Sequence, residues 1–248
     1  MNIKITLAAT MLLVLSLGFD LSMQPAATNS YIVQGADVPQ IKALVVEHGG
    51  EITHELGVIR AVAADLTVDQ VADLRRHDDV RRVYDNAAVE TAGKPPKNDG
   101  NDSGTTDPGT TESATDTFYT TLVNGDAVHQ MGIDGSGIGI AVLDTGLWKH
   151  TGIKNDAAGN LRIKAVYNAM TDTVATSVLS GDDPAGHGSH VASIAVSSLM
   201  TADASARYNG VAPGAHLLSV QAFDEDGNGT YADVGRAIDW IVANRKKH

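Results

Sequence analysis

Residues 137–146 read Gly-Ile-Gly-Ile-Ala-Val-Leu-Asp-Thr-Gly. A near-continuous apolar run is typical of a strand that is buried on both faces of a parallel sheet. Asp144 follows the run directly, and functional groups of open α/β sheets gather at the carboxyl ends of strands. We therefore expect a buried strand that ends in a candidate catalytic carboxylate. Asp-Thr-Gly alone also marks aspartic proteases and ordinary strand-end turns, so it does not decide the chemistry.

The sequence after this strand alternates between helical and extended patterns. Apolar residues recur at helical spacing over 190–200, a strand is expected over 216–223, and a helix over 230–247. Thr230 and Asp233 form a capping box at the start of that last helix, and basic residues at its end suit the negative end of the helix dipole. Strands that alternate with helices predict an α/β layer with a parallel sheet.

A second candidate group lies in Gly186-His187-Gly188-Ser189-His190-Val191-Ala192, which places His187 at the start of a helix. The positive end of a helix disfavours an imidazolium, whereas a nearby carboxylate favours it. This opposition can hold the pKa of a histidine in the range that a general base needs. His187 and His190 could instead ligate a metal, but no third ligand lies at a recognisable spacing.

A third motif is Gly210-Val211-Ala212-Pro213. The three motifs, in this order, resemble those of the subtilase family of serine proteases, over roughly residues 124–245. The resemblance implies that Asp144 is the aspartate of a catalytic triad and that His187 is its general base. It also implies a subtilisin-like parallel-sheet domain that cleaves protein or peptide substrates and requires no cofactor. Structural calcium is frequent in the family, but no loop here identifies a metal site.

The serine of the triad is not found. In subtilisin it lies on the order of 150 residues beyond the histidine, and the printed sequence ends at His248. No serine after His187 lies in the family's Gly-Thr-Ser-Met-Ala context. We therefore expect residues 117–248 to be the N-terminal part of a subtilase catalytic domain. A degenerate pseudoprotease and a non-enzymatic protease inhibitor or folding helper remain as alternatives.

Residues 30–90 form a separate pattern of strand, helix, two strands, helix and strand, which is the α+β ferredoxin-like order. The strands and helices are expected at 31–33, 41–48, 51–66 (two strands around Gly57), 67–74 and 80–89. Subtilase precursors carry such a domain as an inhibitory propeptide, so the resemblance implies an intramolecular propeptide here. Its tail, Ala87 to Ala92, is expected to lie extended in the substrate cleft by strand addition.

The stretch from Asp224 to Gly229 matches the start of a calcium-binding EF-hand loop. However, its twelfth position is Gly235 instead of glutamate, and a strand precedes it instead of a helix. In the subtilase family this stretch resembles the loop whose backbone pairs with substrate. The resemblance therefore implies that Gly227, Asn228 and Gly229 bind substrate.

The remaining segments bear on location and partners. Residues 1–29 carry Lys4 and then an apolar run, as a signal peptide does, so we expect secretion and no stable membrane span. Residues 91–116 are almost entirely polar and are expected to be a disordered linker. The net charge of -12 argues against a nucleic-acid partner, and the absence of cysteine excludes disulfides and thiolate catalysis.

Overall fold

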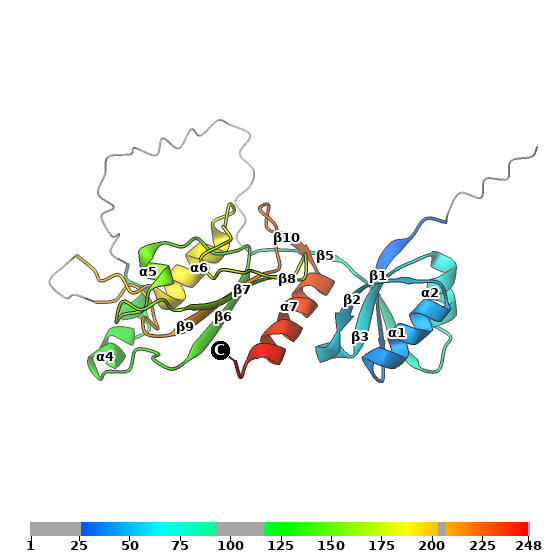
Figure 1. Cartoon of the computed structure of the whole chain (residues 1–248), viewed down its shortest axis with the longest axis horizontal. Helices are drawn as coiled ribbons and strands as arrows, with labels where there is room; N and C mark the ends of the chain where they lie inside the picture. Colours follow the sequence, from blue (N-terminus) through cyan, green and yellow to red (C-terminus); the bar gives the residue numbers. More distant parts are fainter. Residues whose placement is uncertain (1–25, 93–116, 203–206, 248) are drawn as a thin grey trace, which may run out of the picture.

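The computed structural model describes residues 26–92, 117–202 and 207–247. Two four-stranded sheets lie on either side of one helix that joins them (Figure 1), and a two-stranded sheet links the two units. The predicted signal peptide falls mainly on residues 1–25 and the predicted linker mainly on 93–116, outside the described residues. Within the described ranges, no helix is long and apolar enough to cross a membrane.

The first unit, residues 29–85, is a four-stranded antiparallel sheet with two helices. Its strands lie in the order β2-β3-β1-β4. The elements are β1 (Asn29–Gly35), α1 (Val38–Glu47), β2 (Glu51–Leu56), β3 (Ala61–Leu66), α2 (Val68–Leu74) and β4 (Val80–Asp85). The predicted order of strands and helices is therefore the one observed. Between β2 and β3 the chain forms a short 3₁₀ helix, η1 (Gly57–Ile59), and then Arg60 with a positive φ, instead of a simple turn at Gly57.

The core of the first unit forms where the helices cover one face of its sheet. Ile41, Leu44 and Val45 of α1 are buried against strand residues such as Val33 and Val62. The predicted capping box of α2 is present, because Thr67 and Gln70 bond to each other's backbone amides. The apolar face predicted for α1 is thus the buried one. In α2, Val71 and Leu74 are buried, but Val68 at the same helical spacing is 68% exposed.

The last predicted strand of this unit, residues 80–89, is wrong as a single element. The structure divides it into β4 and β5 (Ala88–Glu90), and β5 pairs with a strand of the second unit instead of the first. The break lies at Asn86. Its side chain donates to Ser30 Oγ at 3.2 Å and accepts from the Ala232 amide at 2.9 Å, so it bridges the two units.

The second unit is built on a four-stranded sheet in the order β6-β9-β7-β8. The three strands β6, β9 and β7 are parallel, as predicted, while β8 is antiparallel to β7. Its strands are β6 (Gly139–Asp144), β7 (Ile163–Asn168), β8 (Thr173–Val174), β9 (His216–Gln221) and a separate β10 (Asn228–Thr230). Its helices are α3 (Tyr119–Leu122), α4 (Gly125–Gln130), α5 (Thr151–Lys154), α6 (His187–Val196) and α7 (Tyr231–Asn244).

Helices α6 and α7 lie on opposite faces of this sheet. Leu217 of β9 packs in one cluster with Val196 of α6, whereas Val220 packs in another with Ala237 of α7. Leu217 and Val220 are three positions apart, and side chains of a strand alternate between faces, so the two clusters are on opposite sides. The predicted capping box of α7 is present, with Thr230 and Asp233 bonded to each other's backbone amides.

Helix α7 also carries the contact with the first unit. The Asp239 carboxylate accepts hydrogen bonds from the amides of Gly57 and Val58, at 2.5 and 2.6 Å. Ala232 at the start of α7 shares a small apolar cluster with Ile32, Leu56, Ala61 and Ala63 of the first unit. One helix is therefore packed between the two sheets, and it holds the tail of the first unit near the second (Figure 1).

Candidate active site

Asp144 is the last residue of β6 and is buried, with 7% of its surface exposed. Its Oδ1 accepts a hydrogen bond from the Thr145 amide at 2.8 Å, and its backbone carbonyl accepts one from the Ala222 amide at 2.9 Å. The parallel pairing of β6 with β9 brings these two strand ends together. The carboxylate is thus held at the carboxyl edge of the sheet, where the apolar run predicted it.

His187 is the first residue of α6, and its Nδ1 lies 2.6 Å from Oδ1 of Asp144. The contact predicted between these two residues is confirmed. A carboxylate can only accept, so Nδ1 carries the proton and donates it to Asp144. This hydrogen bond raises the pKa of His187 above its ordinary value, although partial burial of the ring opposes the charge.

The other ring nitrogen of His187, Nε2, lies 2.9 Å from the backbone carbonyl oxygen of Ala92. A carbonyl oxygen also only accepts, so both ring nitrogens face acceptors. Only the doubly protonated imidazolium can donate to both at once. With the tail in place, the ring is therefore held in the form that cannot act as a base.

The tail of the first unit, residues 87–92, runs along the edge formed by β10. Strand β5 pairs antiparallel with β10, so that Asn228 lies opposite Glu90 and Gly229 opposite Val89. The Thr91 amide donates to the Gly227 carbonyl at 2.9 Å. The three residues predicted to bind substrate thus lie beside the predicted tail, and strand addition is the mode of contact.

Glycine is needed at Gly227 and Gly229 because backbone and side-chain atoms come close. A Cβ on Gly229 would lie 2.3 Å from the Ala222 carbonyl oxygen, and one on Gly227 would lie 2.5 Å from Thr91 Oγ1. Gly227 also has a positive φ of 76°. The Asp224 side chain, which the calcium alternative would require as a ligand, accepts hydrogen bonds from the amides of Asp226 and Asn228 and so shapes this turn.

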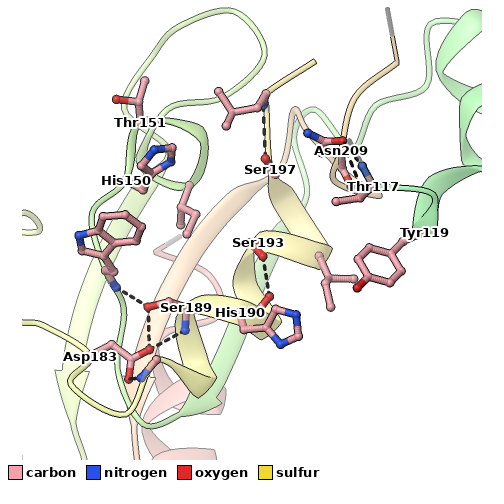
Figure 2. Close-up of a pocket in the computed structure, with 15 residues that line it drawn as sticks. Thr117, Tyr119, His150, Thr151, Asp183, Ser189, His190, Ser193, Ser197 and Asn209 are labelled. Carbon is pink, nitrogen blue, oxygen red and sulfur yellow. Dashed lines mark hydrogen bonds between the residues drawn. The ribbon is translucent and has the colours of Figure 1, made fainter. Parts of the chain in front are cut away.

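A separate cavity of about 750 Å³ lies along the side of α6 (Figure 2). Its lining includes Trp148, His150 and Ile153 from the segment after β6, together with His190 and Ile194 of α6. The tail that reaches His187 runs along β10 and not through this cavity. The contacts that a substrate strand would make near Asp144 and His187 are therefore those of the tail along β10, and they lie outside this cavity.

Metal ligation by His187 and His190 receives no support from the structure. His187 is bonded through both ring nitrogens to Asp144 and Ala92. In the ranges that the structure describes, no group of three or more His, Cys, Asp or Glu side chains is arranged to hold a metal ion.

Gly188 permits the close approach of α6 to β6. A Cβ at this position would lie 2.4 Å from the Gly146 carbonyl oxygen and 3.1 Å from Cβ of Asp144. Both of these atoms belong to the segment that carries the carboxylate. The small residue after His187 therefore sets the distance between the two candidate catalytic groups.

Gly188→Ala is expected to destabilise the second unit by about 1–3 kcal/mol, because overpacking at a backbone contact forces the helix away. Both tryptophans, Trp148 and Trp240, belong to the second unit, so their fluorescence during urea unfolding measures the change there. Gly57→Ala is the control, since a Cβ there would meet its nearest atom at an ordinary 3.7 Å. Equal unfolding midpoints for Gly188→Ala and the unaltered chain would contradict this assignment.

Asp144→Asn is expected to move the titration of His187 to lower pH, because the amide keeps the shape of the carboxylate but loses its charge. The folded-state pKa of His187 is raised, so the contact stabilises the folded chain below the pKa of the unfolded histidine. That stabilisation is lost as the pH rises through the folded-state pKa. An NMR titration of the ring protons measures the shift, with Asp69→Asn in α2 as a control. An unchanged midpoint would show that the contact does not form in solution.

The comparisons with known proteins agree with this geometry. The profile of the subtilase family matches residues 135–247, which contain Asp144, His187 and β10. Over these residues the chain is similar to the subtilase family. The match covers the sheet of the second unit and both of its long helices, α6 and α7.

Curated proteases are similar to the chain, one over most of its length and one over less than half of it. The thermostable alkaline protease of Halalkalibacterium halodurans is 28% identical over 194 residues, which are 78% of this chain and 43% of that protein. The serine protease AprX of Bacillus subtilis is 32% identical over 110 residues, 44% of this chain and 22% of that protein. The chain spans less than half of the length of these two proteases.

A solved structure extends the likeness to the first unit. Fervidolysin from Fervidobacterium pennivorans, described as a keratinolytic enzyme related to subtilisin, superimposes with a TM-score of 0.58 and 21% identity. The alignment covers 88% of this chain and 34% of fervidolysin. This similarity establishes a subtilisin-like α/β fold.

Proposed function

We propose that the chain is the front part of a secreted subtilase precursor, a serine endopeptidase in which Asp144 and His187 supply two members of a triad. The observation that carries this proposal is the 2.6 Å contact between His187 Nδ1 and the buried Asp144 carboxylate. In such a triad Nε2 takes the proton of a serine hydroxyl while the aspartate stabilises the imidazolium. The serine and the oxyanion-hole donors would come from sequence beyond this chain.

The proposal assigns residues 30–90 as an inhibitory propeptide and residues 117–248 as the catalytic portion, with 91–116 as the linker. Two observations support the propeptide role: β5 adds to β10 as a substrate strand would, and the Ala92 carbonyl contacts Nε2 of His187. A tail held there blocks the cleft and keeps the histidine protonated. We propose that the substrates are proteins or peptides and that catalysis requires no cofactor. We assign no calcium site.

Secretion forms part of the same proposal. The apolar run after Lys4 within residues 1–29 supports export as a signal peptide. A similar protein, the minor extracellular protease Epr of Bacillus subtilis, is 28% identical over 212 residues and covers 82% of this chain. Fractionation of cells that express the chain would place it outside the cytoplasmic membrane. Retention of the whole product in the cytoplasm would remove the export part of the proposal.

A direct test is to read the gene beyond the codon for His248 and to assay the whole encoded polypeptide on casein. We expect a Gly-Thr-Ser motif and an activity that His187→Ala abolishes, with His190→Ala as the control. A frame that stops without such a motif would favour the second candidate, a non-enzymatic inhibitor that acts through the first unit and its tail. A complete frame that is inactive despite the motif would favour a pseudoprotease.

A further inference from the structure

Asp183 is a buried carboxylate that belongs to none of the sequence motifs. It lies on the loop before α6, four positions ahead of His187, and only 7% of its surface is exposed. Its oxygens bond to Thr145, Gly186 and Ser189, which are sequence neighbours of Asp144 and His187. Figure 2 shows Asp183 beside Ser189, with dashed lines that mark the bonds between them. A buried charge of this kind requires compensating hydrogen bonds.

Each oxygen of Asp183 accepts two hydrogen bonds. Oδ2 accepts from the amide and the hydroxyl of Ser189, at 2.7 and 2.6 Å. Oδ1 accepts from the hydroxyl of Thr145 at 2.6 Å and from the Gly186 amide at 3.1 Å. Burial opposes the charged form, but these hydrogen bonds outweigh it and lower the pKa of Asp183. The group is therefore a carboxylate at neutral pH.

The partners of Asp183 are the immediate neighbours of the catalytic candidates. Thr145 follows Asp144, its amide donates to Oδ1 of Asp144, and its hydroxyl accepts from the Gly188 amide at 3.0 Å. Ser189 lies two residues after His187, and its hydroxyl accepts from the Trp148 amide at 2.7 Å. Asp183 thus ties the end of β6 to the start of α6 through a hydroxyl on each side.

Asp183 also supplies the charge that the start of α6 lacks. The N-cap residue that precedes α6, Gly186, has no side chain with which to cap the helix. The positive end of a helix disfavours an imidazolium on its first residue. The carboxylate of Asp183 offsets that field, and its charge favours the protonated ring of His187. The other charged groups beside it are Asp182 on the same loop and Lys149, which donates to the carbonyls of Leu147 and Gly181.

We propose that Asp183 is a positioning residue, which holds His187 against Asp144 through Thr145 and Ser189. Its negative charge also offsets the positive end of α6, so that the first residue of the helix can carry an imidazolium. The inference rests on the proposed function for the meaning of the pair, but the contacts themselves are present in this chain. A positioning role of this kind predicts a change in the titration of His187 without any change in the groups that contact its ring.

The test uses the 248-residue chain, with Asp183→Asn compared with Asp182→Asn. Both variants remove one negative charge from the same loop, but Asp182 bonds to the Asp183 amide and not to Thr145 or Ser189. Asp183→Asn is expected to move the NMR titration of His187 to lower pH and to lower the exchange protection of the Ser189 amide about 10–100-fold. Asp182→Asn is expected to leave both nearly unchanged. A folded Asp183→Asn chain with an unaltered His187 midpoint would overturn the proposal.

If Asp183→Asn does not fold, Thr145→Val and Thr145→Ser replace it. The valine removes the hydroxyl that links Asp183 to the Gly188 amide, whereas the serine keeps it. We expect the His187 Nδ1 proton to exchange faster with solvent in the valine variant only, and equal exchange in the two variants would overturn the proposal. Asp144→Asn distinguishes failure of the positioning role from failure of the proposed function. If Asp144→Asn shifts the titration of His187 and Asp183→Asn does not, the positioning role fails while the catalytic pair stands. If neither variant shifts His187, the pair itself and the proposed function fail.

Discussion

The 248-residue chain alone is expected to hydrolyse peptide bonds about 10⁶-fold more slowly than a complete subtilisin, the loss that removal of the triad serine causes in subtilisin. In the described part of the chain, the hydrogen bond of His187 Nε2 goes to the Ala92 carbonyl. The serine hydroxyls nearest in sequence bond elsewhere, Ser189 to Asp183 and Ser193 to the His190 carbonyl. Without a hydroxyl at Nε2, no acyl-enzyme can form.

Purified chain, assayed on casein and on a chromogenic peptide, measures this rate. His187→Ala is the matched control, and it is expected to leave the residual rate unchanged, because a base without a nucleophile contributes little. A serine-directed covalent inhibitor provides the second control. Substantial turnover that this inhibitor abolishes would identify a serine of this chain as a nucleophile and would contradict the expectation.

Residues 30–92, produced separately, are expected to inhibit a complete subtilisin, and residues 30–86 are expected to inhibit about 10²–10³-fold more weakly. The shorter form lacks the tail, which pairs with β10 and is bonded through Thr91 to Gly227 and through Ala87 to Tyr231. Three or four such hydrogen bonds, each worth about 1 kcal/mol net, correspond to this change in affinity. The first unit retains its own apolar core in both forms.

Subtilisin E of Bacillus subtilis, which is 24% identical to this chain over 204 residues, is a suitable test protease. The inhibition constant is measured for both lengths, and then for Thr91→Pro and Thr91→Ala in the longer one. Proline removes the amide that donates to Gly227, whereas alanine keeps it, so only proline should weaken inhibition. Equal inhibition by the long and short forms would rule out the tail as the inhibitory element.

The sequence alone predicted the elements that depend on local patterns. The apolar run before Asp144 became β6, the Thr230–Asp233 box opens α7, and the Thr67–Gln70 box opens α2. The pairing of Asp144 with His187, 43 residues apart, was predicted from family motifs together with the rule that functional groups gather at strand ends. Each of these features is encoded in a short stretch of sequence, as an apolar run, a capping box or a family motif. Local sequence patterns are therefore sufficient to find them.

The features that only the tertiary structure decided are polar contacts between residues far apart in the chain. Asn86 ends β4 because its amide bridges Ser30 and Ala232, and nothing in the local pattern of residues 80–89 marks that break. Asp239 on α7 binds the amides of η1, and Asp183 joins Thr145 to Ser189. Polar side chains between packed elements bond to whichever donors and acceptors those elements bring to them. Those partners have no fixed spacing in the sequence, so the roles of Asn86, Asp183 and Asp239 exist only once the sheets and helices have been assembled.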